Sequence, residues 1–313
     1  MTDHEAATQQ FIDHRELLFG IVYNMLGSVA DTEDVLQDTW LSWAAVDRER
    51  IENPRAYLVR IAINRALARQ SSIKRRRETY VGQWLPEPVV TDEPDPLLRA
   101  ESSSMALLVV LESLSPAERA VFVLHEAFGY PHADIADMLG RSPEAVRQLA
   151  HRAREHVRAR RPSRYPVDSR VQRQVTERFV AATLGGDLKA LLDILAPDVT
   201  LWTDGGGKGP ATSLRPVHGR DAVANLFVAV GANASAGFHV TYRQVNGDPS
   251  ALVFNARAPF AVLVLDLDPN GDLVRGVYSV TNPDKLTRIP GRAEQGRMEP
   301  PSISSHKDAP PRG

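Results

Sequence analysis

The segment 142–161, SPEAVRQLAHRAREHVRARR, predicts a helix with two contrasting faces. Ser142 suits the position that caps a helix, and Pro143 suits the first turn. Apolar residues at steps of three and four form one stripe, made of Val146, Leu149, Ala150, Ala153 and Val157. The opposite face is polar and mostly basic: Glu144, Arg147, Gln148, His151, Arg152, Arg154 and Arg158. Such a helix needs an apolar scaffold behind it and favours a polyanion in front.

The residues before this helix predict its scaffold. Ser115 and Glu118 form a capping box that begins one helix. Gly-Tyr-Pro at 129–131 ends that helix, and a short helix at 132–139 leads into a glycine turn. The order is typical of a helix-turn-helix whose last helix enters a major groove. An ordinary three-helix bundle with a solvated basic face is the alternative, which the cap, the turn and the charge asymmetry disfavour.

Length and charge distribution bound the rest of the chain. A chain of 313 residues predicts two or three domains. Its net charge of -2 conceals two basic segments: 53–77 holds eight Lys/Arg and no acid, and 141–164 holds eight Arg against two Glu. The chain has no cysteine, which excludes disulfides, a thiolate zinc site and a cysteine nucleophile. The acidic N-terminus is unlike a signal peptide and no apolar run is long enough to cross a membrane, so we expect a cytoplasmic protein without membrane contact.

Two amphipathic helices are predicted near the N-terminus, at 8–26 and from about residue 28 onward. In the second helix the acids are expected on exposed positions: Asp31, Glu33, Asp34 and Asp38. Acids in the first turn stabilise a helix through its dipole, which is one explanation of Asp31 and Glu33. Asp38 lies beyond that turn, so an acidic docking face for a basic partner is the competing explanation.

A third helix is predicted to begin at Asn53-Pro54 and to continue through the basic segment ending at Arg77. Its buried stripe is Val59, Ala62, Ile63, Ala66 and Leu67. Arg60, Asn64 and Arg65 point the other way with Ile61 beside them, and Lys74, Arg75 and Arg76 follow near the end. Asn and Arg can contact base edges and phosphates, and an apolar side chain can lie against a displaced base. A merely solvated Arg-rich helix is the alternative.

These motifs carry a specific resemblance. Residues 31–41, DTEDVLQDTWL, resemble region 2.2 of extracytoplasmic-function (ECF) sigma factors, and residues 53–64, NPRAYLVRIAIN, resemble their regions 2.3 to 2.4. Residues 114–161 resemble region 4. The resemblance implies core RNA polymerase as partner, through its β′ clamp helices and β flap, and promoter DNA. It places Asp31, Glu33, Asp34 and Asp38 on the helix that docks on the clamp.

The resemblance also divides the basic residues between two promoter elements. It implies recognition and melting of the −10 element by Arg60, Ile61, Asn64, Arg65, Lys74, Arg75 and Arg76. It implies recognition of the −35 element by Ser142, Glu144, Arg147, Gln148, His151, Arg152 and Arg154. Two all-α DNA-binding domains are therefore expected, a region 2 helical bundle and a region 4 helix-turn-helix.

Between them, residues 80–101 are rich in proline and acids and predict an extended linker. Trp84 in this linker is costly to leave in water, so we expect it to dock in a groove; an incidental exposed aromatic is the alternative. After about residue 167 two helices are followed by period-two strands, one interrupting helix at 220–230, and a hairpin turn at 269–272. The pattern predicts an α+β cone.

The cone resembles the SnoaL-like domains of the NTF2 superfamily, and the whole chain resembles ECF sigma factors of the sigma J type. Three signatures carry this: WLPEP at 84–88, DGGGK at 204–208 and NPDKL at 282–286. They imply regulatory contacts in cis through Trp84, Pro86, Asp204, Gly205, Gly206, Gly207, Lys208, Asn282, Asp284 and Lys285, in place of a separate anti-sigma factor. DGGGK lacks the spacing of a phosphate loop, so nucleotide binding is not expected.

Cones of this kind often enclose acid/base residues, and the candidates are His239, Tyr242, Asp266, Asp268 and Tyr278. Strand alternation cannot place all of them inside, so we expect no enzyme, no cofactor and no metal. The expected division is 1–79 (region 2), 80–101 (linker), 102–165 (region 4), 166–289 (cone) and 290–313 (disordered tail). An operator-binding regulator that works without polymerase and a SnoaL-type enzyme with attached DNA-binding domains are the rival functions.

Overall fold

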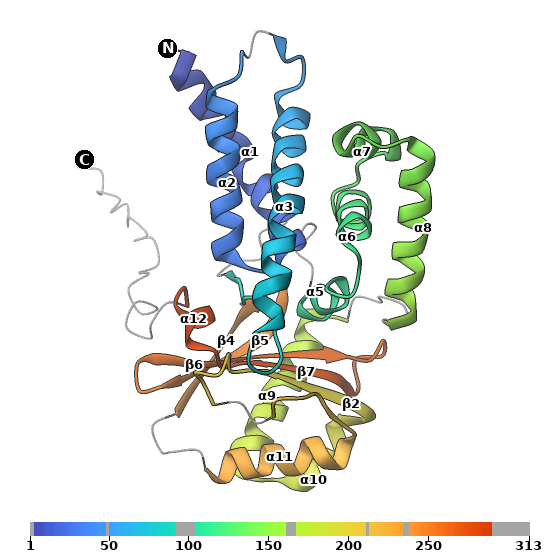
Figure 1. Ribbon diagram of the computed structural model, residues 1–313. Coiled ribbons are helices and arrows are strands. Elements are labelled where there is room, and N and C mark those ends of the chain that lie inside the picture. The colour runs from blue at the N-terminus through green and yellow to red at the C-terminus, as the bar shows by residue number, and fades with distance from the viewer. Residues whose placement is uncertain are drawn as a thin grey trace, which may run out of the picture.

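The structure is a computed structural model that describes residues 3–47, 50–91, 104–160, 167–210, 213–233 and 238–289. It has two groups of helices above a sheet whose lower face carries further helices (Figure 1). The second part of the expected linker and the expected disordered tail lie outside the described residues.

The first group, called the N-terminal bundle here, consists of α1 (Asp3–Leu26), α2 (Val29–Ala44) and α3 (Pro54–Glu78). The hydroxyl of Ser28 accepts from the Asp31 amide and caps α2. The Asn53 side chain accepts from Ala56 N and caps α3. Local capping thus fixes where both helices begin. Their inward stripes form a core whose largest fully buried side chains include Trp43, Leu18, Ile21, Leu58 and Ile63.

The second bundle contains α5 (Met105–Leu111), α6 (Pro116–Phe122), a π-helical turn η2 (Val123–Ala127), α7 (His132–Leu139) and α8 (Pro143–Arg160). The predicted capping box at Ser115 and Glu118 is present. Gly140 ends α7 with φ +60°, a left-handed conformation that suits glycine. The short helix, glycine turn and basic helix are therefore confirmed. The preceding helix ends as a π-helical turn, which the sequence pattern did not predict.

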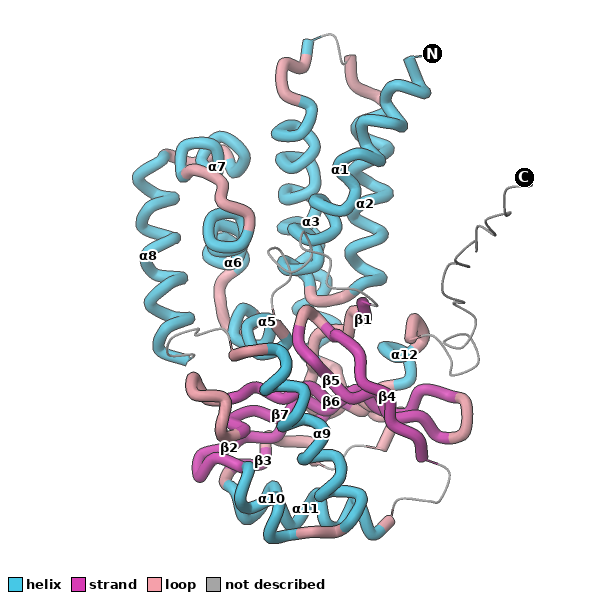
Figure 2. Tube along the Cα trace, turned by 180° about the vertical axis from the view of Figure 1, so that it is seen from behind, coloured by secondary structure: helices cyan, strands magenta, loops and turns pink. Residues whose placement is uncertain are grey.

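The two bundles share one hydrophobic core. Ile21 and Trp43 of the first bundle and Ile135, Met138 and Val146 of the second belong to the same cluster of buried side chains. Figures 1 and 2 show α3 beside α6 and α7 from opposite sides. The two bundles that the sequence predicts on either side of the linker therefore pack directly against each other.

The cone is built on one seven-stranded sheet in the order β1-β4-β5-β6-β7-β2-β3. The strands are β1 (Val90–Thr91), β2 (Leu195–Asp204), β3 (Val217–His218), β4 (Phe238–Val245), β5 (Asp248–Asn255), β6 (Ala258–Leu267) and β7 (Val274–Val280). Neighbours are antiparallel except β2 and β7, which are parallel. The predicted hairpin between the last two strands is present, since β6 and β7 pair directly. The α+β class predicted from the period-two strands is therefore correct.

Each face of the sheet has its own cover (Figure 2). Helices α9 (Ser169–Gly185), α10 (Leu188–Ile194) and α11 (Arg220–Ala232) pack on one face around Phe179 and Leu201. The other face buries Leu85 of the linker, Met105 of α5 and Leu286 of α12 (Pro283–Leu286). The cone therefore holds its second core against the linker and the second bundle.

The first part of the linker is a built element and not a free spacer. Residues 85–88 are buried, and Val90 and Thr91 form the edge strand β1 of the cone sheet, paired antiparallel with β4. Leu85 is 1% exposed. Leu85 is buried in an apolar core of the cone, and the residues of β1 pair with β4 at the edge of the sheet. The segment is therefore fixed on the cone and does not extend into water.

Candidate nucleic-acid interface and interdomain junction

Helix α8 presents the polar face that the sequence predicted. The Ser142 hydroxyl accepts from Ala145 N at 3.2 Å and caps the helix. Val146 and Ala153 are buried in the bundle core. The exposed side of the helix carries Ser142, Glu144, Arg147, Gln148, His151 and Arg152, with Arg154 half-buried beside them. The predicted −35 residues thus lie on one accessible face.

Acidic residues partly neutralise and orient this face. Arg147 Nη2 donates to Glu144 at 2.6 Å, and Arg154 Nη1 donates to Glu126 at 3.3 Å. The bond from Arg147 lowers the pKa of the Glu144 carboxyl. Glu144 therefore holds the Arg147 guanidinium above the N-terminal part of α8, where recognition helices contact bases.

The predicted −10 residues lie along α3. Arg60, Asn64 and Arg65 are exposed and Ile61 is half-buried. Asn64 Nδ2 donates to Arg60 O at 2.8 Å and, across the bundles, to the carbonyl of Met138 in α7 at 3.1 Å. We call the surface formed by Arg60, Ile61, Asn64 and Arg65 the −10 face. It is accessible, but α7 already contacts it.

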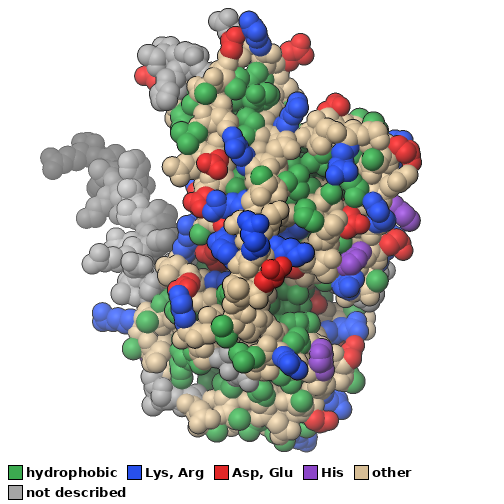
Figure 3. Space-filling model, in the orientation of Figure 1, with side chains coloured by type: hydrophobic (Ala, Val, Ile, Leu, Met, Phe, Trp, Pro, Cys, Tyr) green, Lys and Arg blue, Asp and Glu red, His purple; other side chains and the backbone are tan. Residues whose placement is uncertain are grey.

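The basic end of α3 forms the densest positive patch on this side of the molecule. Lys74, Arg75 and Arg76 are exposed there, and Lys and Arg side chains gather over the lower part of α3 in Figure 3. A positive surface next to the −10 face suits contact with a phosphate backbone.

The acidic helix differs from the expectation at Asp31. This residue is 6% exposed, and its carboxylate accepts from Arg69 Nε at 2.9 Å and Arg76 Nη2 at 2.7 Å. Burial raises the pKa of Asp31, but the bonds from the two arginines outweigh it and the pKa is lowered overall. The prediction that Asp31 is exposed was wrong because the basic half of α3 packs over the start of α2.

The other acids of α2 have different surroundings. Glu33 pairs with Arg15 of α1 at 2.8 Å, and Asp34 pairs with Arg69. Asp38 is exposed, as predicted. Of the four predicted polymerase contacts, Asp31 is the one whose carboxylate is turned into the protein.

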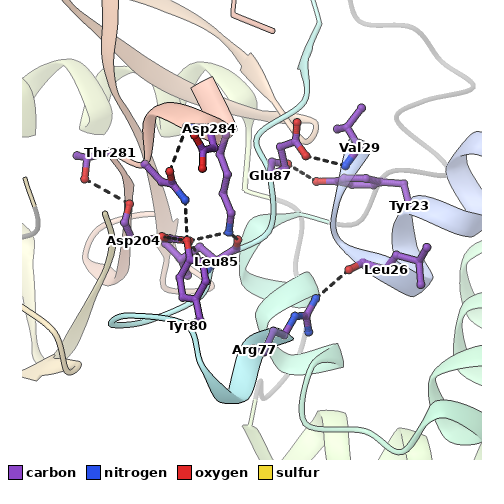
Figure 4. A network of polar contacts seen from close by, with 12 residues as sticks. Tyr23, Leu26, Val29, Arg77, Tyr80, Leu85, Glu87, Asp204, Thr281 and Asp284 are labelled. Carbon is purple, nitrogen blue, oxygen red and sulfur yellow. Dashed lines mark hydrogen bonds and ion pairs between the residues drawn. The ribbon is translucent and has the colours of Figure 1, made fainter. Parts of the chain in front are cut away.

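A buried carboxylate joins the linker to the cone. Asp204, at the end of β2, is 0% exposed. It accepts from the Tyr80 hydroxyl at 2.5 Å, from Leu85 N at 2.8 Å and from Lys285 Nζ at 2.7 Å (Figure 4). These residues and Asn282 are called the junction below. The structure thus brings DGGGK, NPDKL and the linker signature together.

Close packing explains the glycines of the DGGGK loop. Asn282 Nδ2 donates to the Tyr80 hydroxyl at 2.7 Å and lies against Gly206. A Cβ on Gly206 would lie 2.3 Å from that nitrogen, and φ at this residue is +59°. A Cβ on Gly207 would lie 3.0 Å from Val81. The Gly205 carbonyl accepts from Gly209 N at 2.8 Å and closes the turn. A side chain at Gly207 would therefore press on Val81 of the linker, and one at Gly206 would press on Asn282 of the cone.

Trp84 is docked against the rest of the protein, as predicted, and it lies between two cations. The Arg77 guanidinium lies 3.4 Å and Lys285 Nζ 4.1 Å from ring centroids of Trp84. A Cβ on Gly27 would lie 2.7 Å from the ring, so the N-terminal bundle also touches it. Cation–π attraction strengthens in such a desolvated setting. Pro86 next to it is buried.

Lys285 connects these groups. Its ammonium donates to Leu85 O as well as to Asp204. Burial lowers the pKa of Lys285 to about 8, against the opposing attraction of Asp204. Asp204 and Lys285 therefore form a buried ion pair whose removal from water is compensated by hydrogen bonds at both ends.

Lys208 does not share this role. From the family resemblance we expected Asp204 and Lys208 together to supply charges for a contact with the sigma core or its linker. Lys208 instead pairs with Asp284 at 2.5 Å. Both residues belong to the cone, and both side chains are exposed, at 61% and 62%. The loop turns after Asp204, which sends the two ends of the motif to different surroundings.

Sequence reasoning missed a second contact. The Glu87 carboxylate accepts from Val29 N at 2.8 Å and holds the start of α2. The Tyr23 hydroxyl donates to Glu87 O at 2.6 Å and accepts from Asn246 Nδ2 at 2.7 Å. A glutamate between two prolines was visible in the sequence, but its target lies 58 residues away. This chain of bonds ties α1, the linker and the β4–β5 turn together, and Figure 4 shows its part around Glu87, Tyr23 and Val29.

The acid/base candidates of the cone do not all converge: Asp266 and the Tyr278 hydroxyl both lie close to Gly276, whereas the other three stand apart. Tyr242 packs with the helix-covered core, whereas Tyr278 lies in the core on the other face, stacked on Trp202. Asp268 accepts from the amides of the hairpin turn at 2.8 and 3.0 Å. His239 is exposed. Their positions are those of separate strand and turn residues.

Two general properties concern the described ranges alone. No group of three or more His, Asp or Glu side chains there is placed to hold a metal ion. None of the helices in those ranges combines the length and apolar character that crossing a bilayer requires.

Comparison with known proteins agrees with this fold. The models for sigma-70 region 2, sigma-70 region 4 and the SnoaL-like domain match residues 11–77, 104–157 and 176–279. The fold and these matches define a sigma-70-type transcription factor with a fused SnoaL-like domain.

Relatives that span the whole chain narrow the class. The chain is 37% identical over 308 residues to the ECF RNA polymerase sigma factor SigJ of Mycobacterium tuberculosis, covering 93% of this chain and 96% of the relative. It is 30% identical to the probable ECF RNA polymerase sigma factor SigI of the same species, covering 95% and 99%. The crystal structure of Mycobacterium tuberculosis SigJ superposes with a TM-score of 0.71 and 34% identity, over 90% of this chain and 98% of that one. The chain belongs to the family of ECF RNA polymerase sigma factors.

Proposed function

We propose that this chain binds core RNA polymerase and directs promoter-specific transcription initiation. The −10 face and the basic end of α3 contact the −10 element, and the exposed face of α8 contacts the −35 element. One observation carries the proposal: two separate helices, α3 and α8, each present an arginine-rich exposed face on an apolar scaffold. Membership of the ECF sigma factor family supports a promoter as the target of those faces.

For polymerase docking we propose Asp38, Asp34 and Glu33, with Asp31 as the residue that fixes α2 on α3. Asp38 is exposed, whereas Asp31 is held by two arginines. The β′ clamp helices are the proposed partner of α2, and the β flap that of the second bundle. We retain the proposed division at residues 79, 101, 165 and 289.

We further propose that the cone regulates the two bundles in cis through the junction, so that no separate anti-sigma factor is needed. The support is the buried bond set of Asp204, which links the cone to Tyr80 directly after α3. Trp84 extends the same contact to the N-terminal bundle, through Arg77 and Gly27.

Reconstituted transcription tests the function. The purified chain and core polymerase are combined with templates from the genome that encodes the chain. A transcript from a defined start site that neither component produces alone is expected. A chain that shifts promoter duplexes but yields no transcript would instead support the operator-binding alternative.

A matched pair of variants tests the cis regulation. Asp204→Asn breaks the junction and Lys208→Ala breaks the exposed pair within the cone. Transcription is expected to change with the first and not with the second. Equal activity of both variants and the unmodified chain would exclude regulation through the junction.

A further inference from the structure

The turn between α6 and α7 stacks two histidines on each other. The rings of His125, in η2, and His132, the first residue of α7, have centroids 4.1 Å apart and planes inclined by 28°. His125 Nδ1 donates to the Tyr130 carbonyl at 2.9 Å, since a carbonyl oxygen can only accept. His132 Nε2 is buried and has no hydrogen-bond partner within the described part of the chain. No hydrogen bond there would thus compensate a proton on that nitrogen.

The surroundings of the pair disfavour a positive charge on His132. This residue stands at the N-terminus of α7, where the helix dipole has its positive end. Cations face the stacked pair from two further elements: Arg147 and Arg154 from α8, and Arg55 from α3 across the ring of Tyr130, at 5.7 Å from the ring centroid. Two unit charges on the stacked rings would repel each other as well.

The acids near the pair do not cancel this charge. Three of them lie nearby: Glu126 in η2, Glu144 in α8 and Asp134 in the first turn of α7. All three are exposed, and the first two already accept from arginines of α8, at 3.3 and 2.6 Å. Burial, His125 and those arginines outweigh the attraction of Glu126 and lower the pKa of His132 below its ordinary value of 6.5.

The pair lies where α8 meets its support. Figure 1 shows α7 beside the start of α8, at the end of the second bundle away from the cone. Ile135 of α7 and Val146 of α8 are buried in the same core. Arg147 and Arg154, which face the pair, are both predicted −35 contacts. A change at the pair therefore reaches the predicted −35 face directly.

We propose that His125 and His132 form an acid-sensitive switch in the helix-turn-helix: the stacked pair holds at most one proton, and a second proton separates the start of α7 from η2 and α8. Because folding lowers the pKa of His132, the stability of the closed turn is full above pH 6.5 and is lost as the pH falls from there through the lowered pKa. Opening removes the support of the −35 contacts at acid pH, a consequence that rests on the proposed function of α8.

Hydrogen exchange of the full chain tests the switch. Protection of the amides in 132–139, corrected for the pH dependence of exchange itself, should fall about three- to tenfold between pH 7.5 and 5.5, because the open turn binds up to one more proton there. His132→Phe keeps a ring on His125 and loses no hydrogen bond at Nε2, so its protection should change less than about twofold. His239→Gln, at an exposed position of the cone, is the matched control and should behave like the unmodified chain.

The outcomes separate the switch from the proposed function. An equal loss of protection in the unmodified chain and in His132→Phe would overturn the switch, as would constant protection of the unmodified chain. If circular dichroism shows that His132→Phe does not fold, His132→Gln takes its place with the same expectation.

Transcription with core polymerase gives the functional readout. Activity at pH 6 relative to pH 7.5 should fall further for the unmodified chain than for His132→Phe, and equal falls would overturn the link to the −35 element. No transcript from the unmodified chain at pH 7.5 would overturn the proposed function, while a loss of protection confined to chains with His132 would still establish the switch in the turn.

Discussion

Asp204→Asn is the substitution that most directly tests the junction. The side chain is fully buried and accepts from Tyr80, Leu85 and Lys285. Asparagine keeps the shape and one acceptor oxygen, but it removes the negative charge opposite a lysine that is 11% exposed. The loss therefore isolates electrostatics and charge-assisted hydrogen bonding from packing.

The magnitude has two parts. Because burial lowers the pKa of Lys285 to about 8, the lysine can shed its proton at pH 7 for about 1.4 kcal/mol, which caps its share of the penalty. Weakened bonds from Tyr80 and Leu85, previously to a carboxylate, add about 1–3 kcal/mol. The expected loss of unfolding free energy is about 3 kcal/mol at pH 7. At pH 9 Lys285 is mostly neutral in the unmodified chain as well, so the loss should shrink by about 1 kcal/mol.

Urea unfolding at pH 7 and pH 9, followed by circular dichroism, measures this loss. Trypsin cleavage after 74–77 gives a local readout, since a loosened Tyr80 should expose the end of α3. Lys208→Ala is the control, because its exposed pair with Asp284 contributes about 0–1 kcal/mol. A loss for Asp204→Asn no larger than that of the control would refute a stabilising junction. A loss that grows between pH 7 and pH 9 would refute the electrostatic reasoning.

Three further predictions concern other parts of the chain. Arg147→Ala should weaken binding to a −35 duplex by about 1–3 kcal/mol and relax base preference, measured by anisotropy on a set of duplexes; unchanged binding would place Arg147 off the groove. Asp31→Asn removes a carboxyl whose pKa two arginines lower from 3.8, so the stability advantage of the unmodified chain should be full at pH 7 and shrink as pH falls below about 4; a pH-independent difference would contradict this. Gly206→Ala should lower the free energy of unfolding by more than the roughly 1–2 kcal/mol that a left-handed alanine costs, because its Cβ would meet Asn282. The control is Gly186→Ala at φ +65°, whose Cβ would have no atom within 4 Å and should show the conformational cost alone. Equal losses for the two variants in thermal unfolding would exclude the clash.

The elements were predictable wherever a local signal decides them. The helix at 132–139 has the predicted bounds, because the proline before it, the glycine after it and the apolar period within it are all local signals. The helix predicted beyond residue 122 instead becomes a π-helical turn. No local pattern marks that extra residue per turn, which packing against α1 and α7 selects.

Exposure was not predictable in the same way. Asp31 has the pattern of a surface acid in a first helical turn, yet its partners, Arg69 and Arg76, come 38 and 45 residues later. The bond of Asn64 to Met138 spans 74 residues. Tertiary packing decides which side of an amphipathic helix contacts another polar surface. The periodicity of charges along the helix does not predict it. A contact of Asp204 with the sigma core or its linker was expected from family resemblance and not from spacing, and the part that Asn282 takes in it was not predicted.

The junction and the contact between the two bundles meet at the same turn of one helix. Tyr80, which Asp204 holds, follows α3 by two residues, and Arg77 within that last turn reaches Leu26 and Glu112. Movement of the cone away from Tyr80 would free this turn, weaken the pair of Arg77 with Glu112 and so loosen the second bundle. A change in the cone can therefore reach the −10 face through α3 itself, without an intervening partner. Asp204→Asn should therefore also speed hydrogen exchange in 132–139 of the free chain, while Lys208→Ala should leave it unchanged. Equal exchange in the two variants would mean that the cone does not affect the packing of α7 on α3.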